Sequence, residues 1–165
     1  MKLINFNYFL NENFDFLNNK RFYNTLIDSV SLYGIDYQDN DGNTILNLLI
    51  DRIIKHFNSS IQNQYEELES IKWLLNHDAD PNIANFFNET PLIKLSRNSY
   101  KMNNNIIKYI NLFITNEKLN WFFVDDNNKM FLSYLSKDIK NDIALRFPEK
   151  YKIYQKFENI NKFNI

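Results

Sequence analysis

Apolar residues along this chain recur three and four positions apart, a spacing that places them on one face of an α-helix. Three stretches carry the pattern: Phe22, Tyr23, Leu26, Ile27 and Val30; Ile71, Trp73, Leu74 and Leu75; and Ile106, Ile107, Tyr109, Ile110, Phe113 and Ile114. Each predicted helix is followed by a polar turn and a second, shorter apolar segment. Only two Gly and three Pro residues are present, too few for the tight turns of a β-sandwich or barrel. The pattern therefore predicts an all-α protein.

The shorter apolar segments are similar to one another in sequence. The matching stretches are residues 41–49, residues 87–95 and, more weakly, residues 127–135. Thr44, Thr90 and Met130 take equivalent places in them, 46 and 40 residues apart. A repeated segment of this kind indicates supersecondary units that stack and bury their apolar faces against one another.

The residues at the start of each segment explain why a helix begins there. The hydroxyl of Thr90 is suited to cap a helix, and Pro91 fits the first helical position, where a missing N–H is harmless. Thr44 is suited to cap the earlier helix in the same way, and Gly42 supplies a turn conformation that a side chain resists. We expect Thr44, Thr90 and Met130 to open equivalent helices that lie side by side.

Residues 71–82, continuing through residues 88–92, resemble an ankyrin repeat. They hold an outer helix, a turn similar to Gly-Ala-Asp-Val-Asn and a Thr-Pro-Leu helix start in the family's order. The resemblance covers residues 20–135 and implies an ankyrin-repeat solenoid of stacked helix-turn-helix hairpins with terminal capping helices. We expect a single domain over residues 1–165: N-terminal capping helices at 1–33, repeats at 34–138, and C-terminal capping helices and tail at 139–165.

The spacing between the copies departs from the family's repeat of about 33 residues. Because the entropy of loop closure grows slowly with length, we expect the first excess in a loop at residues 56–68. The second excess is expected to divide between residues 103–105 and the turn that leads to Trp121. The histidine that follows Thr-Pro-Leu in the family is also absent, and its hydrogen-bond network is predicted to be missing; the residues in its place are Asn47, Ile93 and Ser133.

The two ends of a stack need capping helices with polar outer faces. Residues 3–17 suit an N-terminal capping helix. Residues 139–147, and a helix that starts at Pro148 and includes residues 151–157, suit a C-terminal pair, while residues 158–165 are predicted to fray. The acidic residues 66–69 are expected at a helix N-terminus, where the helix dipole favours them.

Charge and composition narrow the classes of partner. The net charge of −1 comes from 19 basic and 20 acidic residues, so no basic stripe suited to nucleic acid or an anionic membrane is predicted. Cys is absent, and no apolar run approaches the roughly 20 residues that span a bilayer or the continuous core of a signal peptide. We expect a cytoplasmic protein, in its own cell or inside a host cell, that is monomeric by itself.

The resemblance implies binding through the hairpin tips and the concave face of the inner helices. Exposed aromatic residues at tips are typical of interface hot spots. The predicted partner-binding residues are Tyr37, Phe86, Phe87, Trp121, Phe122 and Phe123 at the tips, with Arg52, Arg97 and Tyr100 beside Asp51 and Lys55 on the concave face. The alternative is that insertions bury the aromatic residues and that the charges form a solvated face.

These features favour a protein–protein interaction module that inhibits or recruits another protein. A pathogen or viral effector, a toxin-neutralising immunity protein and a structural spacer are alternatives within the same architecture. A metal-dependent enzyme assembled around the insertions and His56 is the alternative from another class. His56 and His77 are the only histidines, and the chain has no phosphate-binding glycine loop, nucleophile elbow or paired-histidine motif. We therefore expect no catalytic residue, metal or cofactor.

Overall fold

Helices account for the regular structure in the computed structural model, which describes residues 19–55, 61–102 and 106–162. Within these ranges there is no β-strand, and the all-α prediction is confirmed. The α-helices are α2 (Asn19–Tyr33), α3 (Ile45–Lys55), α4 (Ile61–Asn76), α5 (Pro91–Arg97), α6 (Ile106–Ile114), α7 (Lys137–Arg146) and α8 (Pro148–Lys162). Two 3₁₀ turns, η1 (Ser99–Lys101) and η3 (Phe131–Tyr134), complete the set.

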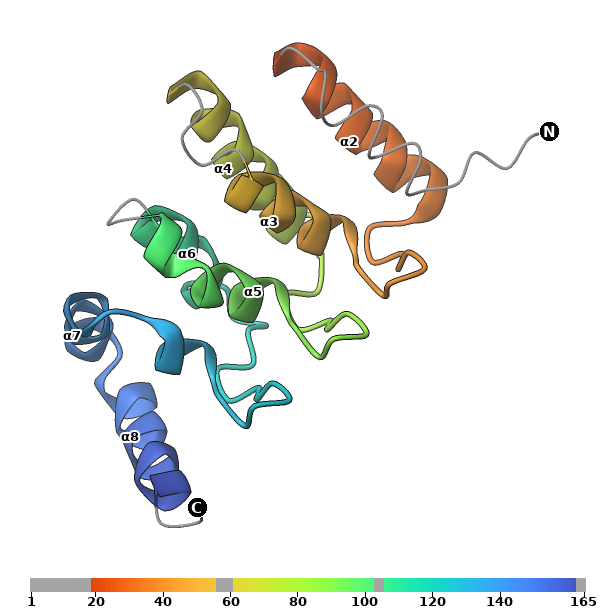
Figure 1. Cartoon of the computed structure of the whole chain (residues 1–165). Helices are drawn as coiled ribbons and strands as arrows, with labels where there is room; N and C mark the ends of the chain where they lie inside the picture. The colour runs from red at the N-terminus through yellow and green to blue at the C-terminus, as the bar shows by residue number, and fades with distance from the viewer. Residues whose placement is uncertain (1–18, 56–60, 103–105, 163–165) are drawn as a thin grey trace.

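The helices form two rows that run side by side from α2 towards α8 (Figure 1). One row contains α3, α5 and η3, which contact in that order, and the other contains α2, α4 and α6. Contacts of α3 with α4 and of α5 with α6 join the rows, and α7 packs against α8 at the far end. The connections before α3, α5 and η3 project from the same edge of the stack (Figure 1).

Threonine side chains cap the starts of α3 and α5, as the sequence predicts. The Oγ1 atom of Thr90 accepts a hydrogen bond from the amide of Ile93 at 3.3 Å, and Thr44 accepts from the amide of Asn47 at 3.3 Å. Met130 has the same extended backbone as Thr90 (φ −80°, ψ 163° against φ −71°, ψ 160°) but no acceptor to offer. The expectation that Met130 opens an equivalent helix is therefore wrong: the segment after it is one 3₁₀ turn, η3, and lacks the side-chain cap that begins α3 and α5.

The core lies between the two rows and consists largely of aliphatic side chains. Fully buried examples come from every pair of helices in the middle of the stack: Ile45, Leu49, Ile53, Ile71, Leu74, Leu92, Ile110 and Phe113. Each such side chain contributes about 1.5–3 kcal/mol when it leaves water. Each row of helices covers the apolar side of the other. The polar connections are therefore left at the edge of the stack.

Several sequence expectations are corrected by the helix boundaries. A loop over residues 56–68 is wrong beyond residue 60, because α4 already begins at Ile61. The acidic residues 66–69 consequently lie inside α4 and not at its N-terminus. Fraying from residue 158 is also wrong, because α8 continues through Lys162. The expected C-terminal helix pair is present as α7 and α8, whereas residues 3–17, 56–60 and 103–105 lie outside the described residues.

Asn47, at the first of the positions without the histidine, makes hydrogen bonds of its own. Asn47 is fully buried, and its Nδ2 atom donates to Thr44 Oγ1 at 3.3 Å and to the carbonyl of Ile83 at 3.2 Å. The side-chain amide of Asn47 on α3 therefore links Thr44, which caps the same helix, to the connection before α5.

Candidate functional site

The three connections at the edge of the stack share one hydrogen-bonding scheme. In each, a buried Asp or Asn side chain accepts from the backbone amides two and four residues later. Asp39 accepts from Asp41 at 2.9 Å and Asn43 at 2.7 Å, and Asn85 accepts from Phe87 at 3.0 Å and Glu89 at 3.1 Å. Asp125 accepts from Asn127 at 2.9 Å and Lys129 at 3.0 Å. The same local chemistry thus builds three tips from three different sequences.

The same turn position is left-handed in all three tips. Gly42 has φ +77°, Asn88 has φ +52° and Asn128 has φ +55°. Glycine and asparagine are the residues that adopt this conformation at least cost. A shared backbone shape, and not a shared residue, makes the tips equivalent.

Hydrogen bonds between neighbouring tips hold them in a row. The carboxylate of Asp36 accepts from the amide of Asp80 at 3.0 Å, and the equivalent Asn82 accepts from the amide of Asn120 at 2.6 Å. The amide of Phe86 also donates to the carbonyl of Asp41 at 2.9 Å. These bonds fix the position of each tip relative to the next.

Two phenylalanines at the middle tip are exposed, as predicted. Phe86 is 75% exposed and Phe87 is 65% exposed. The ring of Phe86 lies against Gly42 of the first tip, where an added Cβ would approach Phe86 Cδ1 to 2.6 Å. Tyr37 and Phe122, at the first and third tips, are 43% and 38% exposed. We call Tyr37, Phe86, Phe87 and Phe122 the tip surface.

The other two aromatic residues of the third tip do not belong to this surface. The prediction that Trp121 is exposed is wrong, because its side chain is only 2% exposed. Its ring packs against Phe131 and Phe147 with centroids 5.6 Å and 5.0 Å apart. Phe123 is half-buried against the core. α7 and α8 follow this tip and provide the surface that covers Trp121.

Arg52 faces the interior and not a solvent-filled groove, which corrects its predicted place. Its side chain is 13% exposed, and its Nε atom lies 3.7 Å from Oε1 of Glu67 on α4. Glu67 is 1% exposed and accepts a hydrogen bond from the hydroxyl of Tyr109 at 3.3 Å. Burial raises the pKa of Glu67 from 4.5 to about 7, against the opposing effect of Arg52.

The cations on α5 are bound to neighbouring elements. Lys94 Nζ lies 2.7 Å from Asp51 Oδ2 on α3, and Arg97 lies 2.6 Å from Asp125 at the third tip. Arg97 also pairs with Glu89 and lies over the ring of Tyr134. Burial alone raises the pKa of Asp125, but hydrogen bonds from Tyr134 and Arg97 outweigh it and hold that pKa below its ordinary value.

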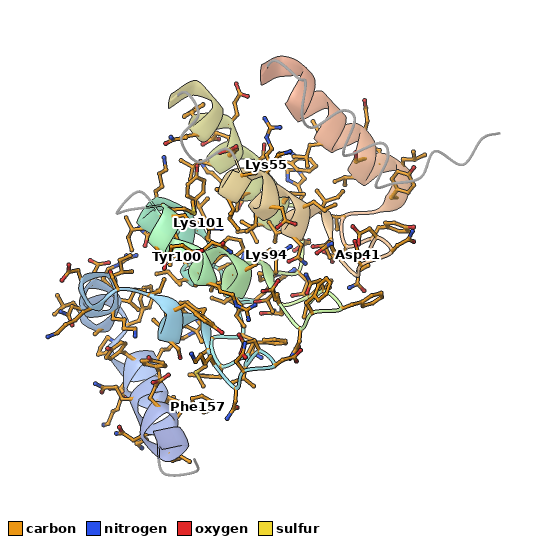
Figure 2. The ribbon with its side chains drawn as sticks, in the orientation of Figure 1. Asp41, Lys55, Lys94, Tyr100, Lys101 and Phe157 are labelled. Atoms are coloured by element: carbon orange, nitrogen blue, oxygen red, sulfur yellow. The ribbon has the colours of Figure 1, made fainter. Side chains whose placement is uncertain are left out.

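Tyr100, which was predicted on the concave face, is strongly exposed, at 76%. It lies on η1, and Figure 2 shows it at the far end of the α5–η1 segment from Asp41 and the tips. With about 1.5 Å of rise per helical residue, the length of α5 keeps Tyr100 apart from the tip surface. Tyr100 therefore does not belong to the tip surface.

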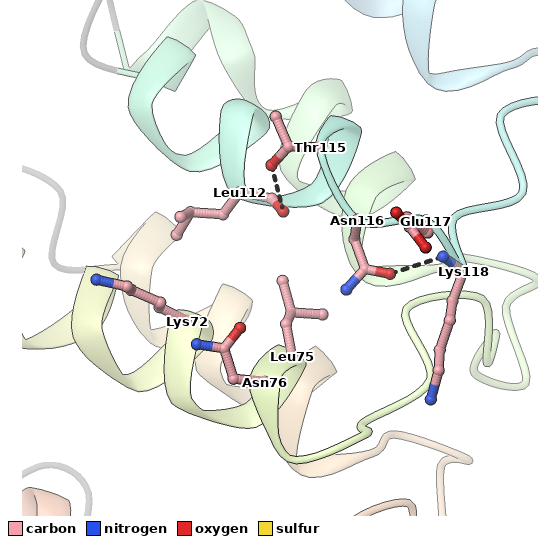
Figure 3. Close-up of a pocket in the computed structure, with 8 residues that line it drawn as sticks. All are labelled: Lys72, Leu75, Asn76, Leu112, Thr115, Asn116, Glu117 and Lys118. Atoms are coloured by element: carbon pink, nitrogen blue, oxygen red, sulfur yellow. Dashed lines mark hydrogen bonds between the residues drawn. The ribbon is translucent and has the colours of Figure 1, made fainter.

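A hollow of about 460 Å³ opens between α4 and α6 (Figure 3). Leu75 and Leu112 face it, and Lys72, Asn76 and Lys118 line its polar border. Lys118 is paired with Asp78 at 2.7 Å. The side chains around it are those of two packed amphipathic helices, so its chemistry is that of a surface groove.

Within residues 19–55, 61–102 and 106–162, no three His, Asp or Glu side chains gather as metal ligands. His56 lies outside the described residues, and His77 stacks on Trp73 with ring centroids 4.1 Å apart. No protein-family model, curated protein or solved structure matches the chain. None of the described helices has the length and apolar character needed to cross a membrane.

Proposed function

We propose that this chain is a divergent ankyrin-type solenoid that binds another protein through its tip surface. The repeated tips support the architecture, because three sequences with little identity form the same side-chain and backbone hydrogen bonds. Thr44, Thr90 and Met130 stand at equivalent positions before α3, α5 and η3, which supports it as well, with an α-helix after the two threonines and a 3₁₀ turn after Met130. This mode of binding suits a protein that inhibits its partner and one that recruits it. It is therefore consistent with an effector, an immunity protein or an adaptor.

The exposure of Phe86 and Phe87 is the observation that carries the proposal. Two adjacent phenylalanines, 75% and 65% exposed, place apolar surface in water on a small protein. The amide of Phe86 is bound to the carbonyl of Asp41 on the neighbouring tip and that of Phe87 to Asn85, so little backbone entropy is lost when a partner covers them. The concave face is a weaker candidate, because Lys94 and Arg97 already bind Asp51 and Asp125.

The test is chemical cross-linking and affinity capture from the native source, repeated with the double variant Phe86→Ser/Phe87→Ser. Hot-spot residues typically contribute 2 kcal/mol or more, so we expect binding to weaken by about 30-fold or more. Leu145→Ser is the matched control, because Leu145 is 84% exposed on α7, far along the chain from the tips. Binding that is unchanged by the double variant would refute the tip surface, and a spacer would capture no specific partner at all.

A further inference from the structure

We infer that the partner of the tip surface is a folded protein that presents a basic surface around an apolar pocket. The inference rests on the proposed function and adds the chemistry of the partner. The aromatic side chains define where the partner docks. The charges around them define which partner is attracted.

The acidic residues of this chain are concentrated in the segments that form the tips. Residues 34–44, 80–90 and 120–130 contain seven of the 20 acidic residues and one of the 19 basic residues. The remainder of the chain has 13 acidic and 18 basic residues, so the two parts are opposite in net charge. A net charge of −1 for the whole chain conceals this separation.

Two exposed acidic residues belong to the same tips as the exposed rings. Asp41 is exposed at the first tip, and its carbonyl accepts from the amide of Phe86 at 2.9 Å. Asp126 is exposed at the third tip. Arg97 contacts Glu89 and Asp125, and Lys118 interacts with Asp80 and Asp36. Together with the exposed Lys129 these cations reduce the negative charge, but the seven carboxylates of the tip segments still outnumber the three cations by four. Their field extends over about 8 Å at physiological salt, which covers the neighbouring rings.

This combination selects among classes of partner. Phosphates of nucleic acid and of anionic lipid are repelled by the carboxylates. A protein surface with Lys and Arg residues is attracted, and the rings of Phe86 and Phe87 leave water only when they enter an apolar pocket. Because the rings project from a fixed row of tips, the pocket has to be present on the partner.

The probe for this inference is a phage-displayed library of a small folded helical scaffold with one randomised face, selected on the immobilised full-length chain. Clones are sorted by whether Phe86→Ser/Phe87→Ser abolishes their binding. We expect tip-dependent clones to carry about a twofold excess of Lys and Arg around apolar residues, relative to the unselected library. Clones that bind elsewhere meet the basic remainder of the chain and should lack this excess.

Charge variants of the chain complete the test. Tip-dependent clones should associate about tenfold more slowly with Asp41→Asn/Asp126→Asn at low salt, and the difference should shrink at high salt. Asp138→Asn/Asp142→Asn removes two exposed carboxylates from α7 and should leave association nearly unchanged. Tip-dependent clones without basic residues would overturn the partner chemistry and leave the proposed function intact. If no clone depends on Phe86 and Phe87, the tip surface and the inference both fail.

Discussion

Replacement of Glu67 by Gln should change how the stability of this protein depends on pH. Glu67 on α4 faces Arg52 on α3, Tyr109 and Lys108 on α6, and its neighbour Glu66. Burial raises the pKa of its carboxyl from 4.5 to about 7, so between these pH values the folded protein holds a proton that the unfolded chain has released. Stability contributed by this proton is complete at low pH and is lost as pH rises through about 7.

The shift corresponds to about 3 kcal/mol in the free energy of unfolding, because one pKa unit is about 1.4 kcal/mol. Urea unfolding at several pH values between 5 and 8 measures it for both proteins. Groups that titrate alike in the two proteins cancel in the difference between them. We expect wild type to lose about 2–3 kcal/mol relative to Glu67→Gln from pH 5 to pH 8. A difference that is constant, or that grows in favour of wild type, would show that attraction to Arg52 outweighs burial.

Two further variants test the packing of the tips. Gly42→Ala should destabilise the protein by about 2 kcal/mol or more in urea unfolding, because Gly42 has φ +77° and an added Cβ would lie 2.9 Å from the amide nitrogen of Phe86. Gly34→Ala, at φ +95° with open space around it, should cost less, and equal costs would contradict the close approach of the two tips. Arg97→Met should cost about 2–3 kcal/mol, since the carboxylate of Asp125 is fully buried. In an Asp125→Asn background the same change should cost clearly less, and an unchanged cost would mean that the pair is not coupled.

Local chemistry made the helix starts and the exposed phenylalanines predictable. The Thr90-Pro91 pair identifies both the cap and the first residue of α5, and the structure has both. Phe86 and Phe87 stand out because they occupy turn positions where polar residues are usual. In each case the residues that decide the structure are close together in sequence.

The corrections concern contacts between distant segments. The third tip resembles the first two, but whether Trp121 is exposed depends on α7 and α8, whose packing no local pattern specifies. Arg52 lies on the polar side of α3, yet its partner Glu67 lies on the next helix, and their pairing depends on the register of the two helices. The buried amide of Asn47 binds the carbonyl of Ile83, 36 residues away, which its local sequence does not reveal.

The side-chain pairs that join α3 to α5 and α5 to η3 restrict how the stack could be extended by duplication of one unit. Lys94 and Tyr134 occupy equivalent positions, as do Asp51 and Arg97, so each interface joins the same two places with different chemistry. A tandem copy of the middle hairpin would set Lys94 of one copy against Arg97 of the other, two cations in contact. Gene duplication of that unit would therefore be opposed until a charge changed sign. The order of the hairpins is thus encoded in side chains, and the units are not interchangeable modules.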